Sequence, residues 1–124
     1  MKINIKAKNM ELTEAIRDYV TKRVTNLEKL LIKIENKGGE AFVNFEVGKS
    51  TNHHKMGEVF HSDCLINMNG LEFYSSVDGE DLYQTIDQVR ESLFNEISKE
   101  KDRKQTLFHR GARSVTKLLK GLSK

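Results

Sequence analysis

The sequence predicts an α+β fold in which a four-stranded sheet carries two helices packed on one face. Two observations carry this prediction. Four segments place apolar residues at every second position, and two segments place them at three- and four-residue spacing, in the order β-α-β-β-β-α. Because each strand then has one apolar face, both helices most simply cover the same side of the sheet.

The first strand and the first helix occupy the N-terminal third of the chain. Ile3, Ile5 and Ala7 alternate with polar residues, as expected for a strand with one buried face. A helix of about 18 residues follows, with Thr13 as its expected N-cap. Its apolar stripe consists of Ile16, Tyr19, Val20, Val24, Leu27, Leu30 and Leu31. The glycine-rich residues 36–39 are expected to end it.

Three further strands are predicted over residues 40–47, 59–68 and 71–77. Residues 48–57 show no period and are expected to form a loop. Asn69-Gly70 is a strong signal for a tight hairpin, because both residues tolerate the positive φ that such a turn requires. The sheet face away from the helices should be polar and partly acidic. Its expected residues are Asn44, Glu46, His61, Asp63, Glu72, Tyr74 and Ser76.

The second helix should begin near Glu80, where Glu80 and Asp81 suit the positive end of its dipole. Its apolar stripe is Leu82, Ile86, Val89, Leu93 and Ile97, and strong helix formers continue to residue 104. A helix over 80–104 is about 37 Å long, whereas a strand of eight residues spans about 27 Å. Its last two turns should therefore project beyond the sheet.

The charge is strongly segregated. Residues 1–98 carry 12 Lys and Arg against 16 Asp and Glu, whereas residues 99–124 carry nine against two. We expect residues 1–104 to form the α/β domain and residues 105–124 to form a basic tail. That tail is either disordered or a short amphipathic helix that forms on a partner, with Val115, Leu118, Leu119 and Leu122 on one face.

Basic residues on the two helices indicate a surface for a polyanion. Lys22, Lys29 and Lys33 share one outer stripe of the first helix, and Arg23 flanks it. The end of the second helix adds Lys99, Lys101, Arg103 and Lys104. We expect these residues to form one continuous ridge suited to phosphate contacts. The competing interpretation is a set of solvated helix faces without a partner.

Catalysis is not indicated. His53 and His54 are adjacent in a predicted loop, while His61 and Cys64 should point to opposite faces of a strand, so no metal site is expected. Cys64 is better explained as a small core residue than as a nucleophile. A lone cysteine allows no internal disulfide and fits a cytoplasmic protein. No signal peptide, membrane span, small-molecule substrate or cofactor is indicated.

Three stretches resemble the ribosome hibernation promoting factor family, also called ribosome-associated inhibitors: TEAIRDYVTKRVTNLEKL at 13–30, INMNGLEFYSSVDGEDLYQTID at 66–87 and SKEKDR at 98–103. The resemblance covers about residues 1–104 and implies the β-α-β-β-β-α fold. It also implies a factor that binds the small ribosomal subunit where messenger and transfer RNA would sit, and so silences idle ribosomes.

The resemblance assigns rRNA contacts to Lys22, Arg23 and Lys29 on the first helix and to Lys99, Lys101 and Arg103 on the second. Lys33, Lys104 and Arg110 complete the candidate set. Ser92 and Asn95 depart from the pattern, because relatives commonly have basic residues there. The tail is basic rather than acidic, and we expect the short form of the family, without the extra dimerisation domain. Whether ribosomes are paired stays open.

A second hypothesis places the function of the protein in the tail. In this alternative the basic amphipathic segment is an interaction module that docks on an anionic membrane surface or on a protein partner. Deletion of the tail separates the two hypotheses. Ribosome association should survive the deletion if the helical ridge binds the ribosome, whereas binding to a membrane or a protein partner should be lost if the tail is the interaction module.

Overall fold

The computed structural model describes the backbone of residues 1–34, 39–50 and 57–121, and side chains as far as Arg103. The elements are β1 (Lys2–Lys8), α1 (Glu14–Thr25), α2 (Glu28–Ile34), β2 (Phe42–Ser50), β3 (Val59–Met68), β4 (Leu71–Gly79) and α3 (Leu82–Gly121). The predicted β-α-β-β-β-α order is confirmed, with the first helical segment divided into α1 and α2.

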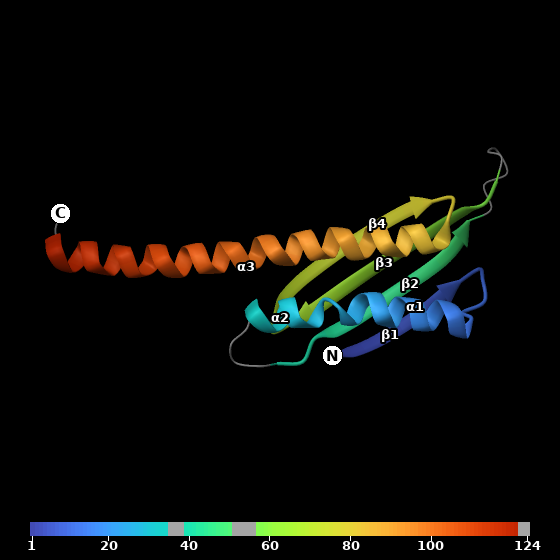
Figure 1. The fold of residues 1–124 in the computed structure, drawn as a ribbon, viewed down its shortest axis with the longest axis horizontal. Coiled ribbons are helices and arrows are strands. Elements are labelled where there is room, and N and C mark those ends of the chain that lie inside the picture. The colour runs from blue at the N-terminus through green and yellow to red at the C-terminus, as the bar shows by residue number, and fades with distance from the viewer. Residues whose placement is uncertain (35–38, 51–56, 122–124) are drawn as a thin grey trace.

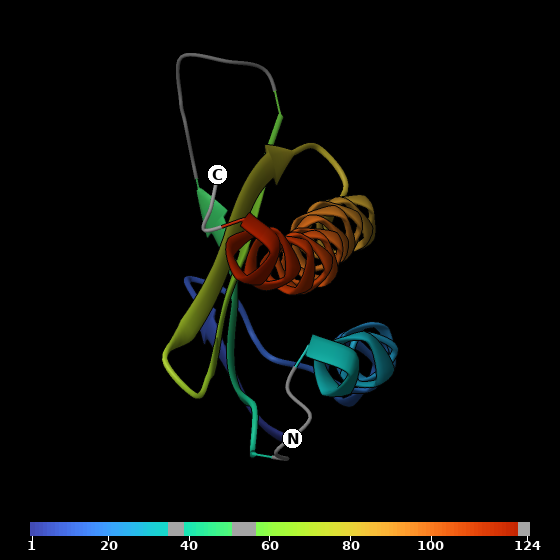
Figure 2. The ribbon, with the colours of Figure 1, turned by 90° about the vertical axis from the view of Figure 1, so that its left-hand side faces the viewer.

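The sheet has the strand order β1-β2-β3-β4. β1 pairs with β2 in parallel, and the other two pairings are antiparallel. All three helices lie on the same side of the sheet (Figure 2). α1 and α2 follow one another beside α3 and both contact it (Figure 1). The predicted two-layer arrangement is therefore confirmed.

The core lies between the sheet and this helical layer. The predicted stripe of α3, from Leu82 to Ile97, is buried, with every member at most 7% exposed. Phe45 of β2 and Ile66 of β3 belong to the same core on the sheet side and are almost completely buried. The hairpin prediction also holds, because Asn69 and Gly70 both have positive φ, at 51° and 85°.

The predicted single first helix is wrong in one respect, because the chain breaks the helix at Asn26. Thr13 caps α1 as expected, accepting a hydrogen bond from the Ile16 N–H at 3.2 Å. At the break the Leu27 N–H donates to the carbonyl of Val24, three residues earlier. This tighter turn keeps Leu27 fully buried while the chain starts α2 at Glu28.

Four predicted boundaries also change, and the first is the start of β2, which begins at Phe42 rather than at residue 40. β2 continues to Ser50, because residues 48–50 pair with β3 and so are not loop. β4 continues to Gly79, and α3 begins at Leu82 with Asp81 as its cap. The Asp81 carboxylate accepts from the N–H groups of Tyr83 at 3.0 Å and Gln84 at 3.4 Å.

α3 does not end near residue 104. Its 40 residues run to Gly121, a length of about 60 Å. Figure 1 shows its C-terminal half extending well beyond the sheet. Strong helix formers and the absence of proline let the helix continue where the sheet no longer supports it. The predicted projection is thus longer than two turns.

Candidate nucleic-acid interface

The outer surface of α1 and α2 carries three of the predicted lysines. Lys22, Lys29 and Lys33 are all exposed. Each is well separated on the helix from the buried positions Val20 and Leu31. A shallow depression lies beside Lys22 and is lined by Tyr19, Thr21, Lys22, Arg23, Thr25 and Asn26. This part of the predicted stripe is therefore open to a ligand.

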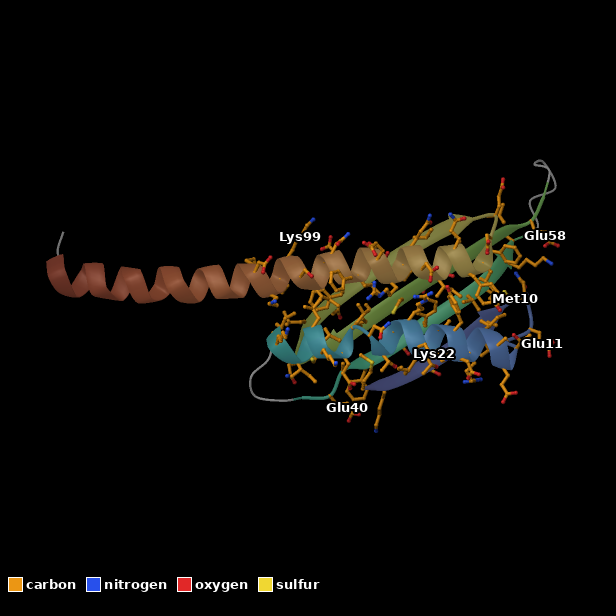
Figure 3. All side chains as sticks on the ribbon, viewed as in Figure 1. Met10, Glu11, Lys22, Glu40, Glu58 and Lys99 are labelled. Carbon is orange, nitrogen blue, oxygen red and sulfur yellow. The ribbon has the colours of Figure 1, made fainter. Side chains whose placement is uncertain are left out.

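The basic residues of α3 lie on two different sides of that helix. Tyr83 and Asp87 contact Tyr19 and so mark the side that faces α1. Lys101 follows Tyr83 by 18 residues, which is five full turns, and therefore lies on the same side. Lys99 follows it by 16 residues and lies nearly opposite, and Figure 3 shows its side chain leaving α3 on the edge away from α1.

The predicted continuous ridge is consequently divided. Lys22, Lys29, Lys33 and Lys101 belong to the helical layer on the side of α1 and α2. Lys99 and Arg103 share the far side of α3. The reason is the helical rotation of about 100° per residue, which sets Lys99 and Lys101 about 200° apart.

Lys99 and Arg103 already interact with carboxylates of α3 itself. Nζ of Lys99 lies 4.0 Å from Glu96. The Arg103 guanidinium donates to both carboxylate oxygens of Glu100, at 3.0 and 2.6 Å. These hydrogen bonds, with the negative charge of Glu100, raise the pKa of Arg103 above the ordinary value for arginine. Exposed pairs of this kind stabilise little, so a phosphate can displace them at small cost.

Arg23 has a structural role that the sequence did not reveal. Its guanidinium donates to the Tyr19 hydroxyl at 2.9 Å and lies 3.0 Å from Asp87 on α3. The hydrogen bond to Tyr19 and then the charge of Asp87 raise its pKa. Arg23 therefore joins α1 to α3, while its side chain stays 41% exposed. Lys104 and Arg110 belong to α3, but the structure describes only their backbone. Their contacts with rRNA stay predictions.

Sequence reasoning missed three residues on the α1-facing side of α3. Tyr83 packs edge-on against Tyr19, and the Arg90 guanidinium lies over the Phe94 ring at 5.2 Å. Tyr83 and Phe94 keep 39% and 37% of their surface exposed. Tyr83, Arg90 and Phe94 are separated by 7 and 4 residues, which places them on one side of the helix, next to the apolar stripe. This spacing is the sequence signal that could have identified them.

The opposite sheet face has the predicted polar character. Every residue expected there is exposed or half-buried. His61 lies between two carboxylates, with Nδ1 against Asp78 and Nε2 2.8 Å from Asp63. The hydrogen bond to Asp78 is the main cause that raises the pKa of His61. Tyr74 is 59% exposed in surroundings that are acidic rather than basic, which does not favour RNA.

The described residues hold neither a metal-binding cluster nor a reactive thiol. Among them, no group of three or more His, Cys, Asp or Glu side chains is placed to hold a metal ion, and His53 and His54 lie outside the described ranges. Cys64 is fully buried, and burial raises the pKa of its thiol to about 12, which makes it a poor nucleophile. Within the same residues, no helix is long and apolar enough to cross a membrane.

Fold and charge together define a small α+β protein with one sheet and one helical layer whose outer surface carries exposed lysines. Residues 3–105 match the family model described as "Sigma 54 modulation protein / S30EA ribosomal protein", and the chain belongs to this family.

Its relatives include ribosome hibernation promoting factors. That of Escherichia coli is 32% identical over 103 residues, which cover 83% of this chain and 96% of the relative. That of Pseudomonas putida is 26% identical over 112 residues, covering 90% and 98%.

Two solved structures share the fold. The first is the N-terminal domain of Protein Y from Thermus thermophilus, with a TM-score of 0.64, 21% identity and coverage of 80% of this chain and 98% of the other. A ribosomal subunit interface protein from Coxiella burnetii has a TM-score of 0.59 and 17% identity, covering 82% and 99%.

Proposed function

We propose that this protein is a non-enzymatic ribosome hibernation factor. It binds rRNA phosphates of the small ribosomal subunit through its helical layer, occupies the channel of messenger and transfer RNA, and thereby inhibits translation. This role requires a cytoplasmic protein and no cofactor. The single observation that carries the proposal is membership of the S30EA family, together with named hibernation factors as relatives that align over nearly their whole length.

The charge distribution supports this mode of binding. The helical layer presents Lys22, Lys29, Lys33 and Lys101, whereas on the opposite face the lysines of β1 lie in the same sheet as Glu46, Asp63 and Glu72. The acidic part of that face opposes a polyanion, which favours the helical layer as the docking side. Contacts to phosphates supply affinity without reading sequence, which suits a factor that recognises one fixed site by shape.

Salt dependence tests the proposed contacts. If about six phosphates are neutralised, affinity for purified small subunits should fall on the order of 1,000-fold between 50 and 200 mM salt. The measurement is a binding titration at several salt concentrations, combined with displacement of a labelled messenger RNA and a labelled transfer RNA. A wild-type affinity that is flat with salt, or binding without displacement, contradicts the proposal.

A charge variant locates the interface. The quadruple variant Lys22→Gln, Lys29→Gln, Lys33→Gln, Lys101→Gln should weaken binding and lower the salt slope by about three. The matched control changes Lys2, Lys6 and Lys8 on β1 and Lys49 on β2 to Gln, which also removes four charges, from three exposed lysines and one half-buried lysine. Equal losses in both variants mean that only net charge matters and that the helical layer is not the docking surface.

A further inference from the structure

Arg90 is a partly buried cation whose hydrogen-bonding capacity is not fully used. Its side chain is 25% exposed, and its one ion pair within the described residues reaches Glu91 at 3.8 Å. Its Nε is buried and has no hydrogen-bond partner among those residues. The buried Nε retains the cost of desolvation, whereas the exposed part of the guanidinium can meet an anion.

The guanidinium of Arg90 lies over the ring of Phe94. The Arg90 carbon Cζ lies 5.2 Å from the ring centroid, which is within the range of a cation–π contact. Phe94 is nevertheless 37% exposed, so a substantial part of its ring is available to another group. Tyr83 is a second exposed aromatic residue on the same side of α3, nearer the start of the helix, and it is 39% exposed.

Lys101 extends this row in the other direction. It follows Phe94 by seven residues, about two turns, and therefore lies on the same side of α3 at about 10 Å along the helix. Exposed aromatic rings alternate here with cations, which is the combination that single-stranded nucleic acid requires. On the open sheet face, Tyr74 lies on β4, at the opposite edge of the sheet from the exposed lysines of β1.

We propose that Arg90 and Phe94 form a contact site for one unpaired RNA nucleotide, in which the ring stacks on the base and the guanidinium binds an adjacent phosphate. This inference rests on the proposed function and extends it from phosphate contacts to recognition of an unstacked base. A protein partner could use the same aromatic surface, but it has no general requirement for a cation beside the ring. RNA meets both features at once.

Two binding partners test the site separately. The first is the small ribosomal subunit. The second is a 12-nucleotide oligouridine, compared with an abasic ribose-phosphate oligomer of the same length at low salt. The wild type should prefer oligouridine over the abasic strand, because only the former offers base faces. Phe94→Leu should remove this preference and weaken oligouridine binding by about 5- to 150-fold.

The two residues should differ in their salt dependence. Phe94→Leu should weaken binding to the small subunit and leave the salt slope unchanged, whereas Arg90→Gln should lower the slope by about one. Phe94→Trp should keep near-wild-type binding, because it retains an aromatic face. Tyr74→Leu on the opposite sheet face is the matched control and should bind like the wild type in both assays.

Each outcome decides the inference. Equal wild-type affinity for oligouridine and the abasic strand overturns it, as does a Phe94→Leu defect that Phe94→Trp does not restore. A large drop in melting temperature for Phe94→Leu would assign the ring to packing and overturns it too. Failure of the wild type to bind small subunits, with base preference intact in the oligonucleotide assay, instead counts against the proposed function alone.

Discussion

Arg23 on α1 and Asp87 on α3 form an ion pair across the helical layer, with 3.0 Å between the arginine Nε and the carboxylate Oδ1. The Tyr19 hydroxyl donates to both oxygens of the same carboxylate, at 2.8 and 2.9 Å. One acidic side chain therefore holds two residues of α1. This connection holds α1 and α3 in their relative positions, and the surface proposed to bind RNA depends on those positions.

Asp87→Ala should destabilise the protein by about 1–2 kcal/mol, because Tyr19 and Arg23 lose a charged partner that is only half exposed. For a chain of 124 residues the melting temperature should fall by about 4 °C per kcal/mol. Urea unfolding monitored by circular dichroism measures the effect. Glu91→Ala is the control, since that carboxylate is 67% exposed. Equal stabilities of the two variants would show that the connection contributes nothing.

His61 should make stability depend on pH. Its pKa is raised in the folded protein, so its contribution is fully present below the ordinary value of 6.5 and is lost as the pH rises through the raised value. The neighbouring charges on the open face are Asp63, Asp78, Glu46 and Lys8.

Urea midpoints between pH 5.5 and 9 test this dependence. The wild type should lose stability toward the alkaline end, whereas His61→Gln should show a flatter profile over the same range. An identical slope in the two proteins would mean that another group causes the pH dependence.

Cys64 should be unreactive in the native state. The thiol is fully buried and its pKa is about 12, so the thiolate fraction at pH 8 is roughly 1,000-fold lower than for a free cysteine. A chromogenic thiol reagent should therefore modify the folded protein very slowly and the urea-unfolded protein within minutes. Rapid modification without denaturant would show that β3 opens readily.

Lys99 and Arg103 should contribute less to RNA binding than the cations on the other side of α3. Both point away from the side of α3 that carries Lys101, so an RNA docked on Lys22, Lys29 and Lys101 does not reach them. The double variant Lys99→Gln, Arg103→Gln should lower the salt slope for small-subunit binding by at most about one. A drop of two or more would place the principal contacts on the far side of α3.

The fold followed from the sequence because its signals are local. The alternation in β1 and the Asn69-Gly70 turn each report a backbone preference that needs no distant partner. The errors concern boundaries decided by packing. Leu27 is buried by a helix break that preserves its contact with the core, and residues 48–50 become strand because β3 extends far enough to pair with them.

The candidate site was predictable only in part. Residue type and helical spacing identify Lys22, Lys29 and Lys33 as an exposed stripe. They do not reveal that Arg23 is bound to Asp87, 64 positions later in the chain, or that Arg90 lies over Phe94 with an unpartnered Nε. Such relationships depend on which side of each helix faces its neighbour.

By itself, the sequence determined the order of the elements, the residues of the core and the concentration of positive charge near the C-terminal end, since periodicity and composition are properties of the chain. Only the tertiary structure decided which cations share a surface. Lys101 and Lys99 are two residues apart, yet α3 rotates about 100° per residue and packs against α1 on one side only, so the first faces the helical layer and the second faces away.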